Sequence, residues 1–206
     1  MPSGNIFDTS LRATAELFAS YLAGSFGGLA IAVATCWPNQ TVRNALESSL
    51  AALGYGNNCL AYVSLTGEGD AAGDFADDGA AAFASSEAPS EDVTARSPNP
   101  DTHQNGAPAA IAETGSKKAA EEELPPLDAH ALFTLIEGLD PKCIIALDAA
   151  AARTLAEAFH VKHILNAHGR FSGHDVVAFS DFASLMNSPE EKQRAWHLLK
   201  KLPKLN

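Results

Sequence analysis

A long acidic segment that separates two blocks of large apolar residues is the strongest constraint on this chain. Ile, Leu, Val, Phe, Tyr and Trp concentrate in residues 6–65 and 127–202, whereas the segment between them is rich in Ala, Gly, Ser, Pro and acidic residues. Such a segment buries too little apolar area to offset the entropy of ordering its backbone, about 1–2 kcal/mol per residue. The sequence therefore predicts one domain in two halves, residues 1–65 and 127–206, interrupted by a disordered acidic insert at residues 66–126.

The insert also carries most of the net charge. Residues 66–126 contain 13 acidic and 3 basic residues, whereas the rest of the chain contains 12 acidic and 11 basic residues. The two halves of the domain are therefore nearly neutral. Because the charge is segregated in this way, the net charge of −11 does not exclude nucleic acid as a partner of the domain.

Cysteine spacing and hydropathy exclude several classes of protein. Cys36, Cys59 and Cys143 lie far apart, which argues against a disulfide framework and against a four-cysteine metal or iron–sulfur site. No apolar run approaches the roughly 20 residues that span a bilayer, and residues 1–8 lack the basic start and apolar run of a signal peptide. We therefore expect a cytoplasmic protein with no membrane partner, no metal and no other cofactor.

Apolar periodicity alternates along the chain between helical and strand patterns. Helical spacing, with Asp8 or Thr9 as the first N-cap, predicts helices over about residues 8–22, 38–53, 128–139, 149–159 and 188–202. Continuous apolar runs predict buried strands over residues 29–35, 59–64, 142–147 and 175–179. This alternation predicts a three-layer α/β/α domain with a mostly parallel sheet of about four strands.

Candidate site residues follow from this fold, because ligands of parallel sheets bind beyond the carboxyl ends of the strands. The loops expected there contain Asp148 and Asp181 as candidate catalytic carboxylates, although both also suit helix N-caps, the interpretation we favour. The same loops contain four candidate ligand-binding residues, which are Thr35, Cys36, Trp37 and Ser64. Cys36 is either a nucleophile or a structural cysteine, and Trp37 either stacks on a base or packs in the core.

A histidine-rich segment precedes the last expected strand. His160, His163, His168 and His174 are expected in one loop, but their spacing follows no standard metal-binding pattern, so we interpret them as a pH-sensitive loop. Arg170, in the same segment, is a candidate phosphate contact if this loop lies against DNA.

The last third of the chain carries a longer pattern. It reads Leu-Asp-Pro-Lys-Cys-Ile-Ile-Ala-Leu-Asp over residues 139–148 and Leu-Met-Asn-Ser-Pro-Glu-Glu-Lys-Gln-Arg-Ala-Trp over residues 185–196. The spacing of Leu185, Pro189, Lys192 and Trp196 resembles the C-terminal half of the uracil-DNA glycosylase superfamily. The order of expected helices and strands in the first half of the chain is similar to that family as well. The resemblance implies an α/β domain of the glycosylase type and a role in DNA repair.

The motifs that would carry glycosylase chemistry depart from the family's pattern. The loop after the first expected strand reads Ala-Thr-Cys-Trp-Pro over residues 34–38, without the family's glycines and water-positioning acid. Leu65 takes the place of the base-reading asparagine, and Asp148 that of a glycine. Asp181 and Phe182 take the places of a His-Pro pair. A leucine cannot hydrogen-bond a base edge, and an aspartate would repel a developing pyrimidine anion. The resemblance therefore implies a catalytically degenerate protein, a pseudoenzyme that binds nucleic acid or protein.

Two other functions stay open at this point. One is an active DNA glycosylase or related hydrolase with a rearranged site that uses Asp181 or Asp148. The other is an interaction scaffold that recruits a protein partner through residues 66–126, with Phe75 or Phe83 as apolar anchors. DNA and a protein partner are thus the two partner classes that these hypotheses predict.

Overall fold

The computed structural model describes residues 6–25, 29–67 and 124–205. The prediction of a disordered insert at residues 66–126 falls almost entirely on residues outside this description, as do Phe75 and Phe83, and it stays a prediction. No helix within the described ranges is long and apolar enough to cross a membrane. The elements in chain order are α1 (Ile6–Leu17), η1 (Ala19–Tyr21), β1 (Leu22–Gly24), β2 (Ala30–Ala34), α2 (Gln40–Ala52), β3 (Leu60–Ser64), α3 (Ala129–Leu139), β4 (Cys143–Ala146), α4 (Ala149–Ala158), β5 (Ala167–Phe171), β6 (His174–Ala178), α5 (Phe182–Leu185) and α6 (Pro189–Leu199).

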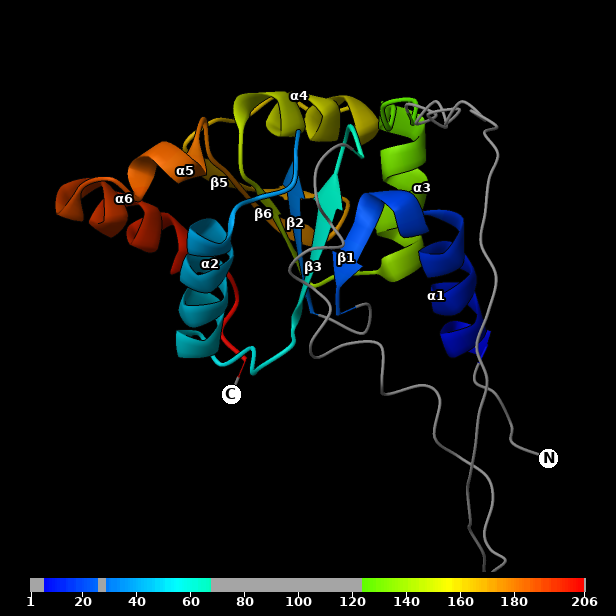
Figure 1. The fold of residues 1–206 in the computed structure, drawn as a ribbon, viewed down its shortest axis with the longest axis horizontal. Helices are drawn as coiled ribbons and strands as arrows, with labels where there is room; N and C mark the ends of the chain where they lie inside the picture. The colour runs from blue at the N-terminus through cyan, green and yellow to red at the C-terminus, as the bar shows by residue number, and fades with distance from the viewer. Residues whose placement is uncertain (1–5, 26–28, 68–123, 206) are drawn as a thin grey trace, which may run out of the picture. The chain divides into compact units, whose positions relative to one another are not determined.

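Both halves of the chain contribute strands to one six-stranded sheet, in the order β1-β3-β2-β4-β6-β5 (Figure 1). The central strands β3, β2, β4 and β6 run parallel, and Ala30 of β2 lies between Leu60 of β3 and Cys143 of β4. The edge strands β1 and β5 run antiparallel to their neighbours. The α/β class is confirmed, but the sheet is mixed and has six strands where about four were expected.

The two additional strands were missed for identifiable reasons. Tyr21 and Leu22 continue the apolar spacing of the first helix, but α1 ends at Leu17, and Leu22 pairs with Val63 in the sheet. The expected N-cap of this helix was also wrong, because Asp8 and Thr9 lie inside α1. Strand β5 reads Ala-His-Gly-Arg-Phe and is mostly half-exposed, so it lacks the apolar run that identifies a buried strand.

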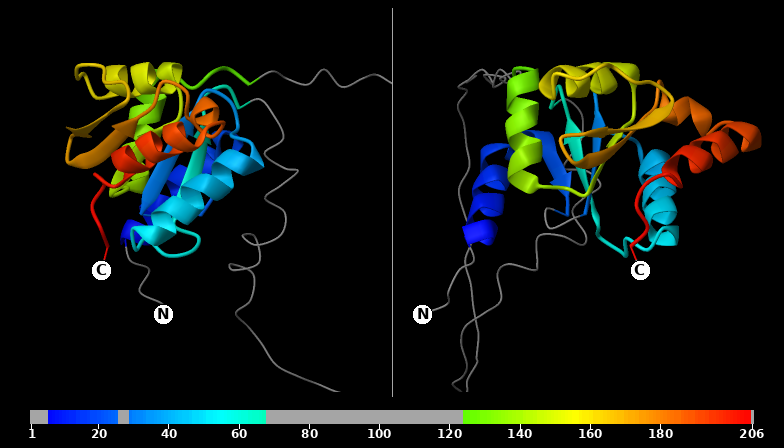
Figure 2. Two further views of the ribbon diagram at one scale, coloured as in Figure 1. Left: turned by 90° about the vertical axis from the view of Figure 1, so that its left-hand side faces the viewer. Right: turned by 180° about the vertical axis from the view of Figure 1, so that it is seen from behind.

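Helices cover both faces of the sheet (Figure 2). Strand side chains alternate between two apolar clusters, so that Ile144 contributes to the cluster beneath α1, α3 and α4, whereas Ile145 contributes to the cluster beneath α2, α5 and α6. Each of these two isoleucines is 0% exposed. Burial on both faces explains why the central strands read as continuous apolar runs.

Side chains cap most of the helices as their sequences suggested. Asn39, Asp128, Asp148 and Ser188 each accept a hydrogen bond from a backbone N–H in the first turn of the following helix. Gly54, with a φ of +89°, follows the end of α2 in the left-handed conformation that glycine adopts without strain. The predicted caps Asp128, Asp148 and Ser188 are therefore confirmed.

Candidate functional site

The loops predicted to form a site lie together at the carboxyl ends of the parallel strands. Thr35 follows β2, Leu65 follows β3, Asp148 follows β4 by two residues and Ser180 follows β6 by two. The chain passes from β3 across β2 to β4, so the strand order reverses between the carboxyl ends of β2 and β4. Ligands of open α/β sheets bind at such a reversal.

Asp148 occupies this position with its own carboxylate. Its Oδ2 accepts a hydrogen bond from the Thr35 backbone N–H at 2.7 Å. Its Oδ1 accepts from the Thr35 hydroxyl at 2.7 Å and from the N–H groups of Ala150 and Ala151 at 3.0 and 2.8 Å. The carboxylate therefore joins the loop after β2 to the first turn of α4 through four hydrogen bonds to the protein itself.

Asp181 lies beside Asp148 but is held in a different way. The two residues form an isolated antiparallel bridge, in which Ala149 N donates to Ser180 O at 3.0 Å and Phe182 N donates to Leu147 O at 2.8 Å. The exposed carboxylate of Asp181 accepts from Ser184 N at 3.0 Å, as the N-cap of α5. Both candidate catalytic carboxylates thus serve as helix caps, which is the interpretation that the sequence favoured.

The remaining polar groups of this edge bond mainly to one another. The carbonyl of Thr35 accepts hydrogen bonds from the hydroxyls of Ser64 and Thr66, at 3.3 and 3.0 Å. Ser64 is 0% exposed, so it is enclosed and not a surface for a ligand. Leu65 is 6% exposed and belongs to the apolar cluster beneath α1, α3 and α4.

Asn166 also belongs to the hydrogen-bond network at this edge, a role that the sequence did not predict. Its Oδ1 accepts from Ser180 N at 3.0 Å, and its Nδ2 lies 3.1 Å from the Ser180 hydroxyl. Asn166 has a φ of +49° just before β5, so the contact depends on the hairpin of β5 and β6. A single asparagine in a histidine-rich segment offers no sequence signal for this role.

Cys36 and Trp37 extend from the same edge. Cys36 is exposed, and the Thr66 hydroxyl lies 3.9 Å from its sulfur. Trp37 is half-buried and packs against the apolar cluster beneath α2, α5 and α6, in agreement with the packing interpretation.

The other two cysteines, Cys59 and Cys143, are buried. Burial raises the pKa of Cys143 to about 12 and also raises the pKa of Cys59, so both thiols resist ionisation.

Thiol labelling should separate the three cysteines. We expect Cys36 to react with a maleimide in the folded protein, because the thiolate is the reactive form and only an accessible thiol can supply it. Cys59 and Cys143 should react only after unfolding. Mass spectrometry of peptides from native and urea-unfolded samples measures this, and native labelling of Cys143 at the rate of Cys36 would contradict the burial.

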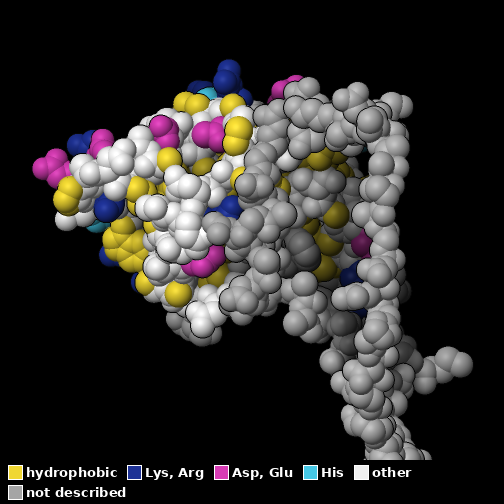
Figure 3. All heavy atoms as spheres, in the orientation of Figure 1, with side chains coloured by type: hydrophobic (Ala, Val, Ile, Leu, Met, Phe, Trp, Pro, Cys, Tyr) yellow, Lys and Arg dark blue, Asp and Glu magenta, His cyan; other side chains and the backbone are white. Residues whose placement is uncertain are grey.

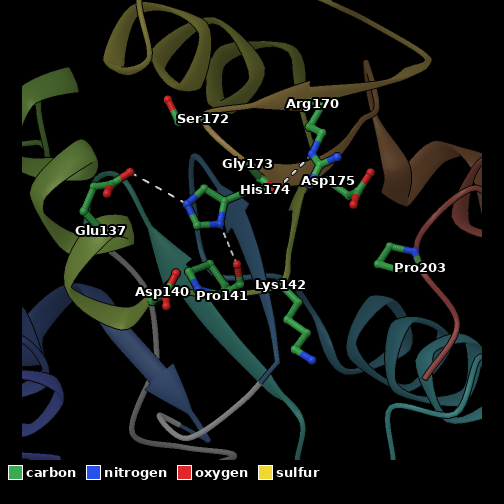
Figure 4. A pocket seen from close by; sticks show the side chains of 10 residues that line it. All are labelled: Glu137, Asp140, Pro141, Lys142, Arg170, Ser172, Gly173, His174, Asp175 and Pro203. Carbon is green, nitrogen blue, oxygen red and sulfur yellow. Dashed lines mark hydrogen bonds and ion pairs between the residues drawn. The ribbon is translucent and has the colours of Figure 1, made fainter. Parts of the chain in front are cut away.

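Arg170 lies near the amino ends of the parallel strands, whereas Thr35 and Asp148 lie at the carboxyl ends. The expectation that Arg170 lies in a loop is therefore wrong. Arg170 belongs to β5 and not to a loop, and its Nε donates to Gly173 O at 3.1 Å (Figure 4). It lines an open pocket of about 450 Å³ at the amino ends of β4 and β6, together with Glu137, Asp140, Pro141, Lys142, Ser172, Gly173, His174, Asp175 and Pro203. It therefore cannot act together with Asp148 or Thr35.

Two of the four histidines are also in strands and not in a loop. His174 is 7% exposed, and its Nδ1 lies 2.6 Å from the Pro141 carbonyl, which fixes Nδ1 as the donor because a carbonyl only accepts. Its Nε2 lies 3.7 Å from Glu137 (Figure 4), and His168 pairs with Asp175 at 3.1 Å. In the part of the chain that the structure describes, no group of three or more His, Cys, Asp or Glu side chains is placed to hold a metal.

Comparison with known proteins adds no assignment: no protein-family model matches the chain, and no curated protein matches it.

Proposed function

We propose that this protein is a catalytically degenerate, uracil-DNA-glycosylase-like domain that acts by binding and not by base excision. The sequence of residues 139–202 supports the glycosylase-like ancestry. The hydrogen bonding of Asp148 supports the loss of catalysis. These four bonds occupy the position at which an α/β sheet of this topology would hold a ligand.

Excision at this edge would require these contacts to break. A base entering between the loops after β2 and β4 would displace a carboxylate from four donors and leave those donors without partners. The negative charge of Asp148 and Asp181 would also oppose the pyrimidine anion that leaves in the reaction. In the described part of the loop after β3, Ser64 is enclosed, Leu65 lies in the core, and the Thr66 hydroxyl donates to the Thr35 carbonyl, so residues 64–66 present no amide side chain to read a base edge.

A uracil-release assay tests this function. We expect no abasic sites above background when the purified chain is incubated with single- or double-stranded oligonucleotides that contain one uracil, scored by alkaline cleavage. An active glycosylase in parallel reactions verifies the substrate. Base release by the wild-type chain that disappears in Asp181→Ala would instead establish the alternative enzyme with a rearranged site.

A further inference from the structure

A groove lies between the start of β5, the end of α5 and one side of α6, with a volume of about 390 Å³. Its apolar lining comes from Leu185, Ala195 and Leu198. Its charged or titratable lining comes from Arg194, His197 and Lys201, all exposed, and no acidic side chain lines it. In Figure 3, the region of α6 carries hydrophobic, Lys or Arg, His and Asp or Glu side chains.

The geometry of α6 places these groups on one face. Residues 194, 197, 198 and 201 follow the i, i+3, i+4, i+7 spacing, with Lys201 in the turn that directly follows the helix. Ala195 and Leu199, at 2% and 1% exposure, bury the neighbouring face against the sheet. Leu198 therefore remains only half-buried, between two cations that are about 10 Å apart along the axis at 1.5 Å per residue.

The positive charge around the groove does not simply reflect a basic domain. Outside residues 66–126 the chain has 12 acidic and 11 basic residues, so three cationic or titratable side chains around one apolar floor are a local excess. The acids of α6, Glu190 and Glu191, lie in its first turn and do not line the groove.

We propose that this groove binds an acidic peptide segment of a partner protein that carries an apolar side chain between its acids. The apolar side chain would be buried on Leu185 and Leu198, and the acids would pair with Arg194 and Lys201. Desolvation of the apolar floor supplies affinity, whereas the cationic rim steers the approach and selects an acidic sequence. The inference rests on the binding role of the proposed function and identifies its surface and the chemistry of the partner.

A nucleic acid fits this groove less well than a peptide does. Single strands bind by stacking bases on aromatic rings above a charged track, and the lining of this groove contains no aromatic ring other than the imidazole of His197. Phosphate groups would gain no binding energy from contact with the apolar side chain of Leu198. An apolar peptide side chain, by contrast, would cover the exposed part of Leu198.

The spacing of the two cations defines the expected ligand. Two acids about 10 Å apart are supplied by residues i and i+3 of an extended polyproline-type peptide, which rises about 3.1 Å per residue with three residues per turn. The sequence Asp-Phe-Ala-Asp at residues 74–77 of this chain has that pattern, so a synthetic peptide of residues 70–82 is a suitable probe.

Fluorescence anisotropy with this labelled peptide and the full-length chain tests the proposal. We expect saturable binding that weakens at least tenfold in the double variant Arg194→Glu, Lys201→Glu. The matched control is Lys192→Glu, Lys204→Glu, which makes the same change of net charge on and just after α6 without altering the groove lining. This control should change the affinity by less than about threefold. Circular dichroism confirms that both variants are folded.

Changes in the peptide test the two parts of the recognition separately. Replacing the phenylalanine by alanine, or both flanking aspartates by asparagine, should each weaken binding at least fivefold. Absence of saturable binding, or equal weakening by the two double variants, overturns the proposal. It is also overturned if a 15-nucleotide DNA strand binds in a manner that depends on Arg194 and Lys201 while the peptide does not.

These outcomes are distinguishable from failure of the proposed function. Uracil release would refute the degenerate-enzyme proposal even if the peptide binds the groove. A chain without uracil release and without peptide binding would leave the first proposal standing and refute the second.

Discussion

Replacing Asp148 with alanine is expected to lower the free energy of unfolding by about 3 kcal/mol. The substitution removes an N-cap, whose loss costs about 0.5–2 kcal/mol. It also removes two hydrogen bonds from Thr35 to a charged acceptor, each of which contributes about 1.5–3 kcal/mol without strict additivity. Urea denaturation followed by circular dichroism measures the change.

Asp181→Ala is the matched control for this prediction. Asp181 is also an aspartate N-cap at the same edge, but it is exposed and accepts from a single backbone N–H at 3.0 Å. Its replacement should cost about 1 kcal/mol. Equal losses for the two variants would show that the contact between Asp148 and Thr35 does not hold the β2 and β4 loops together.

Phe179→Ala is expected to have the largest effect on stability, a loss of about 4 kcal/mol. Phe179 is 0% exposed, and its ring meets that of Phe182 edge-on with centroids 4.9 Å apart. Truncating a buried phenylalanine typically costs about 3–5 kcal/mol through lost transfer energy and the remaining cavity. The same denaturation experiment measures the loss.

Leu17→Ala provides the comparison for Phe179. Leu17 ends α1 and is 72% exposed, so its truncation should change the free energy of unfolding by no more than about 0.5 kcal/mol. A small effect at Phe179, close to that at Leu17, would mean that α5 does not pack on the sheet as the structure places it.

The network around Asp148 connects the stability of this fold to its proposed function. The carboxyl edge of a parallel sheet usually remains open for a ligand, and here a side chain of the protein fills the reversal between β2 and β4. Stabilising this edge and binding a base there are competing uses of the same donors. If Asp148→Ala is strongly destabilising and uracil release is absent, both results follow from this one arrangement.

Local patterns in the sequence predicted the parts of the fold that depend on nearby residues. Asp128, Asp148 and Ser188 were identifiable as N-caps because a cap bonds within three residues of itself. The four central strands were recognisable because burial on both faces requires continuous apolar runs. Such signals do not depend on where the rest of the chain lies.

The errors occurred where a distant partner decides the structure. Leu22 fits the spacing of α1 but joins a strand because Val63 offers it a place in the sheet. His168 and Arg170 have loop-like neighbours, yet they form an edge strand because β6 supplies the backbone partners. Edge strands have one solvated side, so their composition does not distinguish them from loops.

In the candidate site, too, some features follow from nearby residues and others from distant partners. The sequence determined which residues end the strands and therefore that Thr35, Ser64, Asp148 and Asp181 belong to one edge. Only the tertiary structure placed Thr35 within 2.7 Å of Asp148, 113 residues away, and moved Arg170 to the opposite edge. The reason is physical: strand order and strand direction arise from pairing between distant segments, and they decide which loop residues meet and whether those residues face a ligand or one another.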